Sequence, residues 1–200
     1  MPTFFSTPGV FFSSDYSAVN LAVVNGHSYK NKKSDNTNFA LLVSQKFTEP
    51  FNAPIEYGHH IARLANMLTQ NKILVQRFGD LVRGRRTTSA RLYRNNIIPT
   101  LKDAVPGDLS LVLPHRILLD IIEMIKSLDK VSPGLASDET LLYGVEVKFY
   151  SNIIKVNNSF QAKTVKNLYF GGDGAGITRG LMQASVNGVL IAREILDPQK

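Results

Sequence analysis

The sequence predicts an α+β fold, in which a mixed sheet is combined with several helices. Of its 200 residues, 44% are apolar, which is enough to bury a core. Short apolar runs separated by polar turns predict strands, while segments with apolar residues three and four positions apart predict amphipathic helices. The chain has no cysteine, which excludes a disulfide framework and a thiolate metal site and suits a reducing compartment.

Strands are expected in the first part of the chain. Gly9–Phe12, Asn20–Val24 and Asn38–Val43 are short runs rich in Val, Leu and Phe. The stretches between them are dense in Asn, Ser, Gly and Lys, which predicts connecting turns. Asn25-Gly26 predicts a tight turn directly after the second strand, because both residues tolerate a positive φ at little cost.

Helices are expected in the middle of the chain. Apolar spacing predicts one helix over Tyr57–Thr69 and a second that opens just after Pro114 and carries an apolar stripe from Ile117 to Leu128. The arginine-rich stretch between these helices is expected to form loops and short helix. Strands return at Leu141–Tyr150 and Ile153–Val156, where apolar and polar residues alternate.

A change in composition at Pro133-Gly134 predicts a domain boundary. We therefore expect a first domain at residues 1–134 and a second at residues 135–200. Neither part contains an internal repeat or a low-complexity tract. The two parts differ in charge, because the basic residues gather in the first.

The formal net charge of +7 comes largely from one stretch, Lys72–Arg94. This stretch holds seven basic residues against one acidic residue, Asp80, and so carries six of the seven net charges. One interpretation is a basic nucleic-acid-binding module that uses Arg77–Arg94, with Tyr93 as a stacking group. A solvated helix face is the alternative that needs no ligand, and recognition of a phosphate or another anion lies between the two.

Glycine is most concentrated near the end of the chain, where four of the 14 glycines fall within six positions. There an apolar segment that starts at Leu168 is predicted to be a strand running into a glycine turn with one carboxylate, Asp173. A helix is predicted after the turn, because small residues alternate with the apolar residues Leu181, Met182, Val186, Val189, Leu190 and Ile195. Small residues recur every fourth position along it, which predicts a face that can pack tightly against a neighbouring element: Gly180, Ala184, Gly188 and Ala192.

The glycine turn has the residue types of a ligand site. Glycines let a ligand approach the backbone closely, and free N–H groups at the start of a helix favour negative charge. Asp173 does not suit phosphate but can accept hydrogen bonds from hydroxyl groups, as on a ribityl or ribose chain. The dinucleotide fingerprint G-x-G-x-x-G and the Walker motif G-K-[ST] are both missing.

These residues resemble a known family. Residues Asn167–Ile195, NLYFGGDGAGITRGLMQASVNGVLIAREI, are similar to the C-terminal flavin-binding motif of bacterial FAD-dependent dehydrogenases, in particular the NAD(FAD)-utilising dehydrogenases. Upstream, Thr7–Val10 and Val24–Tyr29 with Asn38–Val43 resemble the family's C-P-G-G and N-G-M-S segments, and Gln76–Asp80 resembles its Q-R-x-x-D segment. Thr7 stands where the family often has Cys, and His27 where it often has Met, which argues against a thiol-dependent role.

The resemblance implies an α/β flavoprotein fragment. Residues 1–134 would be an insert domain on the substrate side, truncated at its N-terminus, and residues 135–200 the closing strand, turn and helix of a Rossmann-like FAD-binding domain. The family's opening G-x-G-x-x-G turn, which holds the FAD pyrophosphate, is absent. The chain alone is therefore expected to be inactive and to bind flavin weakly or not at all.

The resemblance also implies particular site residues. Asp173 would hydrogen-bond the ribityl hydroxyls, and the backbone N–H groups of Gly174–Ile177 would face the pyrimidine edge of the flavin. A helix starting near Gly176 would stabilise negative charge on the reduced flavin. The implied cofactor-binding set is Gly172, Asp173, Gly174, Ala175, Gly176 and Ile177. FAD is the implied cofactor of the complete protein, with NAD(P)H as a candidate electron donor, and no acid or base is assigned a catalytic role.

The remaining residues add few candidates. The four histidines have no metal-ligand spacing, so no metal site is expected. The sequence lacks a bilayer-spanning apolar run and a secretory signal, which predicts a cytoplasmic protein without a membrane partner. The expected partners are the N-terminal FAD-binding portion of the parent protein and a small-molecule substrate that the sequence does not identify.

Overall fold

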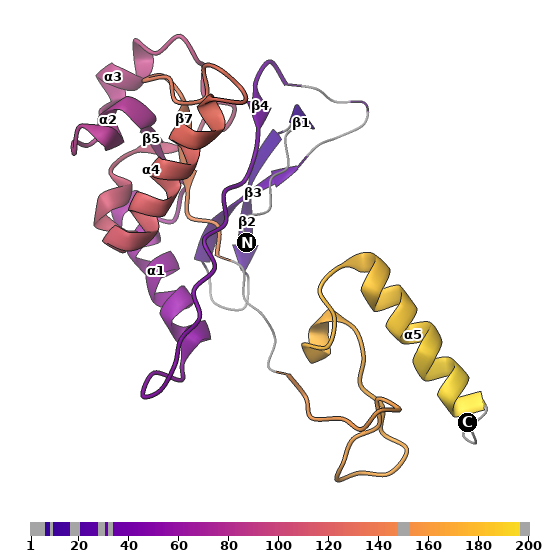
Figure 1. The fold of residues 1–200 in the computed structure, drawn as a ribbon. Coiled ribbons are helices and arrows are strands. Elements are labelled where there is room, and N and C mark those ends of the chain that lie inside the picture. Colours follow the sequence, from indigo (N-terminus) through magenta and orange to yellow (C-terminus); the bar gives the residue numbers. More distant parts are fainter. Residues whose placement is uncertain are drawn as a thin grey trace. The chain divides into compact units, whose positions relative to one another are not determined.

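The computed structural model describes residues 7–8, 10–16, 21–27, 31, 34–147 and 153–196. The chain divides into two compact units, Met1–Val147 and Lys148–Lys200, which we describe separately (Figure 1). The strands are β1 (Thr7–Pro8), β2 (Val10–Tyr16), β3 (Leu21–His27), β4 (Thr37–Asn38), β5 (Leu74–Arg77), β6 (Val105–Pro106) and β7 (Leu141–Gly144). The helices are α1 (Pro54–Thr69), α2 (Phe78–Val82), α3 (Ser89–Tyr93), α4 (His115–Asp129) and α5 (Leu181–Leu196), with short 3-10 helices η1 (Leu109–Leu111) and η2 (Asp173–Ala175).

A three-stranded mixed sheet lies at the centre of the first unit. Its middle strand is β5, which pairs in parallel with β6 and antiparallel with β7. All of the β5 side chains except that of Arg77 are buried. The mixed sheet with surrounding helices confirms the predicted α+β class, although the arginine-rich stretch was expected to form only loop and short helix. That expectation missed β5 and is otherwise confirmed by α2 and α3.

The N-terminal hairpin is formed by β2 and β3, which pair antiparallel over seven residue pairs. The pairs run from Val10 opposite His27 to Tyr16 opposite Leu21. Asn25 and Gly26 lie inside β3, opposite Phe12 and Phe11, so the tight turn predicted there is wrong. Tertiary pairing overrides the local turn preference, because β2 extends far enough to cover both residues. Val24 also donates a backbone hydrogen bond to the Val145 carbonyl, which joins the hairpin to the end of β7.

The strand predicted over Asn38–Val43 is much shorter in the structure. Only Thr37 and Asn38 form β4, which pairs with β1, and residues 39–48 have no regular secondary structure. The apolar run Leu41–Val43 lies instead beside α4, where it lines an open cavity of about 390 Å³. The apolar character of the run is therefore used in packing against a helix rather than in a sheet.

Helix α1 confirms the helix predicted over Tyr57–Thr69 and begins three residues earlier. Pro54 occupies its first turn, where the missing N–H costs no hydrogen bond. Buried Asn66 connects the helix to β3: its amide oxygen accepts from the Ala22 N–H at 2.7 Å, and its amide nitrogen donates to the Ala22 carbonyl at 2.7 Å. One side chain thus satisfies both backbone groups of Ala22.

Helix α4 confirms the helix predicted after Pro114, and it presents buried Leu118 and Ile125 to the interior. Together with the hairpin, α1 and β5, it encloses the apolar core of the first unit. Pro133 and Gly134 lie in the turns that follow α4, within this unit. The buried core residues are Leu21, Val23, Ile61, Ala62, Ala65, Leu74, Leu81, Leu109, Val112, Leu118 and Val145.

The second unit is built from a looped segment and α5, which confirms the predicted C-terminal helix. The strands predicted at Ile153–Val156 and before the glycine turn are replaced by isolated bridges, Val156 with Ala162 and Gln161 with Tyr169. These segments are too short to form a ladder among the described residues. The assignment of residues 1–134 and 135–200 to an insert and a FAD-binding domain stays a prediction.

Candidate functional site

The glycine turn of the second unit is a sharply folded backbone segment. Gly172 and Gly176 have φ values of 73° and 70°, and Gly180 has φ 136°, conformations that side chains with a Cβ rarely adopt. Between the first two glycines the chain makes η2, and the turn closes where the Gly176 N–H donates to the Asp173 carbonyl at 3.0 Å. The glycines are thus required by the conformation of the turn itself.

Asp173 joins the turn to the start of α5. Its carboxylate accepts a hydrogen bond from the Thr178 hydroxyl at 2.6 Å, and both carboxylate oxygens lie 3.1 Å from the Gly180 backbone nitrogen. The residue is exposed, so its carboxylate also faces solvent. Because a carboxylate can accept about four hydrogen bonds, capacity for additional donors is left.

The prediction of a helix starting near Gly176 is wrong, because α5 begins at Leu181. Gly176 has a left-handed backbone conformation and ends η2. Four more residues then separate it from the start of α5. Two of the four N–H groups predicted to face a ligand are used inside the turn, since Gly176 donates to Asp173 and Ile177 donates to the Gly172 carbonyl at 3.4 Å. The negative carboxylate of Asp173 lies at the start of α5.

Buried Asn187 holds the glycine turn against α5. Its side-chain oxygen accepts from the Gly172 N–H at 2.7 Å. A Cβ on Gly171 would lie 2.6 Å from this oxygen and 2.5 Å from the Cδ1 atom of Ile191, so a larger residue there would displace both side chains. Sequence reasoning missed Asn187, although a lone amide between the apolar residues Val186 and Val189 was a usable signal.

The small-residue face predicted on α5 approaches the turn only through its first two members, because a Cβ on Gly172 would lie 4.0 Å from the Ala184 Cβ and the Gly180 N–H binds Asp173. A Cβ on Gly188 would meet no atom within 4 Å, and Ala192 is exposed. Farther along the helix, the turn is contacted by Asn187 and Ile191. The apolar residues of α5 that are exposed are Leu181, Met182, Val186, Val189, Leu190, Ile195 and Leu196.

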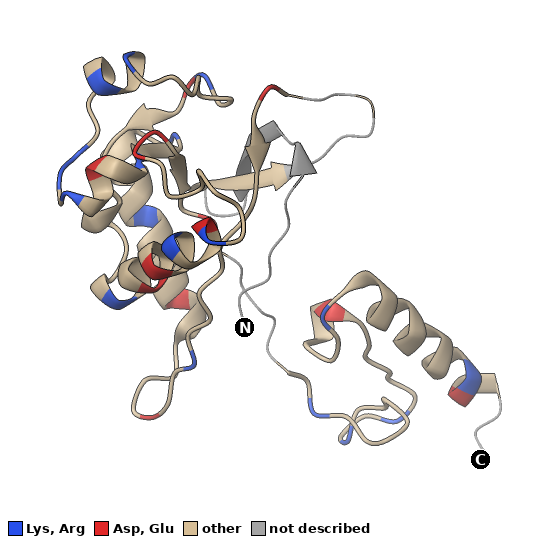
Figure 2. Cartoon of the chain, turned by 45° about the horizontal axis from the view of Figure 1, so that its top comes forward, with Lys and Arg blue, Asp and Glu red and all other residues tan. Residues whose placement is uncertain are grey.

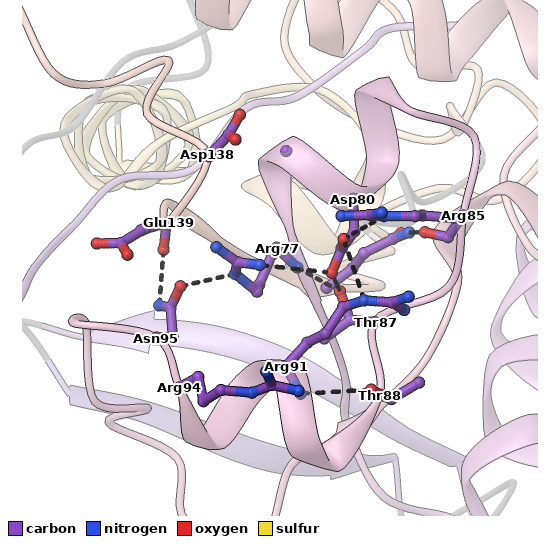
Figure 3. A network of polar contacts seen from close by, with 12 residues as sticks. Arg77, Asp80, Arg85, Thr87, Thr88, Arg91, Arg94, Asn95, Asp138 and Glu139 are labelled. Carbon is purple, nitrogen blue, oxygen red and sulfur yellow. Dashed lines mark hydrogen bonds and ion pairs between the residues drawn. The ribbon is translucent and has the colours of Figure 1, made fainter.

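A second polar site lies in the first unit, where three arginines surround buried Asp80 (Figure 3). The Asp80 carboxylate accepts hydrogen bonds from Arg85 Nε at 2.7 Å and from the Thr87 hydroxyl at 2.9 Å. Arg77 and Arg91 each form a longer ion pair with it, at 3.9 Å. We call Arg77, Arg85, Arg91 and Asp80 the Asp80 cluster.

Burial alone would raise the pKa of Asp80, but its partners outweigh this effect. Hydrogen bonds from Thr87 and Arg85 and the positive charges of Arg85 and Arg77 hold the pKa of Asp80 below its ordinary value of 3.8. The carboxylate is therefore ionised at neutral pH although its side chain is 0% exposed. It belongs to the Gln76–Asp80 segment that sequence analysis singled out.

Neighbouring amide side chains fix the backbone around this cluster. Gln76 accepts from the Leu109 N–H at 2.7 Å and donates to the Arg85 carbonyl at 3.0 Å, which ties β5 to two loops. Buried Asn95 accepts from Arg77 Nε at 2.7 Å. Thr87 and Asn95 were not singled out from the sequence, because they approach Asp80 and Arg77 only in the folded unit.

Neither a metal centre nor a spanning segment is found in the described part of the chain. No group of three or more histidine, cysteine, aspartate or glutamate residues there has the geometry of a metal site. Among the same residues, no helix is both long and apolar enough to cross a bilayer. Burial raises the pKa of Tyr143 to about 12, so this side chain stays protonated at neutral pH.

Comparison with known proteins relates the chain to flavoproteins. A family model described as "FAD-dependent protein, C-terminal domain-like" matches residues 3–149, most of the chain. An uncharacterized protein of Clostridium beijerinckii is 29% identical over 184 residues, covering 88% of this chain and 34% of that protein. The chain therefore spans about a third of the length of this relative. A share of 88% is too large for the first unit alone, so the similarity extends into the second.

Proposed function

Because the chain belongs to the family of FAD-dependent proteins with this type of C-terminal domain, we propose that it is part of an oxidoreductase in which flavin carries hydride transfer. In this proposal the complete protein is a dehydrogenase of the cytoplasm, and NAD(P)H is its candidate electron donor. The flavin supplies the redox chemistry when bound, and the protein positions and tunes it. The observation that carries the assignment of a site is the glycine turn with its exposed carboxylate.

The turn has the properties that a flavin site needs. A Cβ on Gly174 would meet no atom within 4 Å, so open space adjoins the backbone at that point. Exposed Asp173 has accepting capacity beside this space, as a polyhydroxyl chain requires. These two features support the proposed contact between Asp173 and the ribityl hydroxyls.

Each residue of the turn has a separate role in this proposal. Asp173 accepts hydrogen bonds from ligand hydroxyls, while Thr178 and the Gly180 N–H orient its carboxylate. Asn187 fixes Gly172 and so places the backbone that follows. The N–H groups of Gly174 and Ala175 are the candidates for contact with the pyrimidine edge. Gly176 and Ile177 use theirs within the turn, so their part is to shape the backbone.

The exposed apolar side of α5 supports the proposed partner, the N-terminal FAD-binding portion of the parent protein. Leu181, Met182 and Leu196 are each largely exposed, and such surfaces mark interaction sites. Ion pairs within the fold partly neutralise the arginines of the first unit, which reduces the charge available for the alternative of nucleic-acid binding. Arg77, Arg85 and Arg91 are engaged with Asp80, and Arg83 is paired with Asp138 at 2.6 Å.

The test uses the complete parent protein and follows FAD absorption and fluorescence. Asp173→Asn and Gly174→Val are each expected to weaken FAD binding at least about tenfold, the first through lost hydrogen bonds and the second by filling the open space. Glu194→Gln is the matched control, because Glu194 lies in the same unit and hydrogen-bonds the Ser159 hydroxyl instead. Unchanged FAD affinity in both turn variants would refute the assigned site.

A parent protein that is colourless and cannot be reconstituted with FAD would refute the flavoprotein assignment. Activity needs a separate measurement, in which NADH or NADPH is mixed with the FAD-loaded protein and bleaching of the flavin absorbance is followed. Bleaching by either nucleotide supports the proposed donor. A flavin that stays oxidised with both nucleotides, but is reduced chemically, would exclude NAD(P)H as donor.

A further inference from the structure

The Asp80 cluster has an excess of positive charge. Three guanidinium groups share one carboxylate, so the cluster carries a local charge of about +2. Two acidic residues lie nearby: Asp138 is paired with Arg83 and also feels the charges of Arg77 and Arg85, and Glu139 accepts hydrogen bonds from Asn96, but neither carboxylate is hydrogen-bonded to an arginine of the cluster. In Figure 2, basic segments recur along the loops that carry α2 and α3, the same part of the chain.

The arginines of the cluster keep hydrogen-bond donors that the described residues do not use. Arg77 donates through Nε to Asn95, and its terminal nitrogens form no hydrogen bond, since NH1 is 3.9 Å from Asp80. Arg91 donates through NH1 to the Arg86 carbonyl, which leaves NH2. Arg85 contacts Asp80 through Nε alone. Guanidinium groups with free terminal nitrogens suit oxyanions, which they bind in bidentate fashion.

The two less exposed arginines are held in place before any ligand arrives. The Arg77 side chain is 17% exposed, and Asn95, its partner, is itself fixed by hydrogen bonds to the carbonyls of Ile97 and Glu139. The Arg91 side chain is 35% exposed and lies on α3, whose first turn is capped by Thr88. A ligand therefore meets oriented donors that are partly shielded from water, which lowers the cost of binding.

We propose that the Asp80 cluster is a binding site for the phosphate group of a small-molecule ligand, with Arg77 and Arg91 as its direct contacts. A phosphate monoester carries a charge of about −1.5 to −2 at neutral pH, which matches the excess charge of the cluster. Asp80 is buried and pairs with both arginines, and each of them keeps a terminal nitrogen that forms no hydrogen bond with the described residues. This inference concerns the first unit and does not depend on the proposed flavin site.

The experiment titrates the 200-residue chain with inorganic phosphate at constant ionic strength, followed by calorimetry and by amide NMR shifts. Saturable binding is expected, with shifts centred on the Asp80 cluster. Arg77→Gln and Arg91→Gln are each expected to weaken phosphate binding about tenfold. Arg86→Gln is the matched control, since it removes an equal charge from the same stretch outside the cluster. Should Arg77→Gln fail to fold, Arg91→Gln on the more accessible α3 carries the test.

Three outcomes would overturn the proposal. The first is equal weakening by Arg86→Gln and Arg91→Gln, because diffuse attraction rather than a site would then explain binding. The second is tighter binding of malonate than of phosphate, which would mean a dicarboxylate site. The third is binding of short single-stranded DNA that phosphate does not displace and that all three substitutions weaken alike, which would mean a nucleic-acid surface.

Discussion

Asp80 and Asp173 both hold a loop to a helix, but they do so in opposite surroundings. Asp80 is buried in the first unit and faces three arginines and a threonine. Asp173 is exposed in the second unit and binds only the Thr178 hydroxyl and the Gly180 N–H among the described residues. The first carboxylate is therefore used within the fold, while the second has hydrogen-bond acceptor capacity left for additional donors.

The two units also differ in how much of their structure is buried. The first has an apolar core drawn from two sheets and several helices, whereas the described part of the second buries only Ala175 and Asn187. A unit with so little buried surface gains little stability from its own packing. The second unit is therefore the part whose stability depends most on single hydrogen bonds.

The largest effect is expected for Asp80→Asn, which removes the charge that three arginines share. The free energy of unfolding should fall by about 3 kcal/mol, because the arginines lose a buried partner. Urea unfolding of the whole chain measures it. Asp138→Asn is the matched control, since its ion pair with Arg83 is half-exposed and its loss should not be measurable. Equal destabilisation by both substitutions would show that burial of Asp80 is not the cause.

A second prediction compares two glycines three positions apart. Gly171→Ala places a Cβ against Ile191 and Asn187, and it should lower the stability of the second unit by about 2 kcal/mol. Gly174→Ala has open space and should have little effect. Hydrogen exchange of the α5 amides measures the stability of this unit. A loss of protection in Gly174→Ala as large as in Gly171→Ala would contradict the described packing of the turn.

Asp173→Ala should lower the free energy of unfolding by less than Asp80→Asn or Gly171→Ala. Its hydrogen bonds are exposed to solvent, so about 1 kcal/mol of stability is expected to be lost. The loss should be confined to the start of α5, where faster exchange of the Gly180 amide reports it. Global unfolding at lower urea concentration, rather than this local change, would mean that Asp173 supports the unit as a whole.

The pH dependence of stability provides the finest comparison. The pKa of Asp80 is lower in the folded chain than its ordinary value of 3.8. The ionised carboxylate therefore makes its full contribution to the free energy of unfolding at pH values well above 3.8. The contribution is lost as the pH falls through the folded-state pKa. The stability gap between the natural chain and Asp80→Asn should therefore narrow on acidification from about pH 7 to pH 3. A gap that stays constant would mean that the charge of Asp80 is not what stabilises the fold.

The sequence predicted the elements whose signal is local. Apolar spacing was sufficient for α1, α4 and α5, because each buries one face of a helix. The Asn25-Gly26 turn failed because pairing with β2 outweighs local preference. Strand β5 was missed because its three buried residues beside an arginine-rich stretch carry no clear period.

The candidate sites also differ in how far local sequence signals predicted them. The glycine turn was found because glycine spacing and a carboxylate are visible in the sequence, yet the start of α5 was placed too early. Nothing local indicates that Asp173 binds the Gly180 N–H or that Asn187 binds Gly172. The Asp80 cluster was visible in the sequence only as net charge and as the Gln76–Asp80 resemblance, because its geometry depends on loops brought together by β5 and α3.

The hydrogen bond from Gly180 to Asp173 links occupancy of the turn to the end of a helix. In the proposed flavin site, a ligand hydroxyl that binds the same carboxylate would compete with this N–H or would reorient the carboxylate toward itself. By thermodynamic reciprocity, the amount by which such a ligand would change the stability of the first turn of α5 equals the amount by which that turn would change the ligand's binding free energy. The Gly180 amide is therefore a built-in reporter, readable by exchange or chemical shift in the absence of turnover.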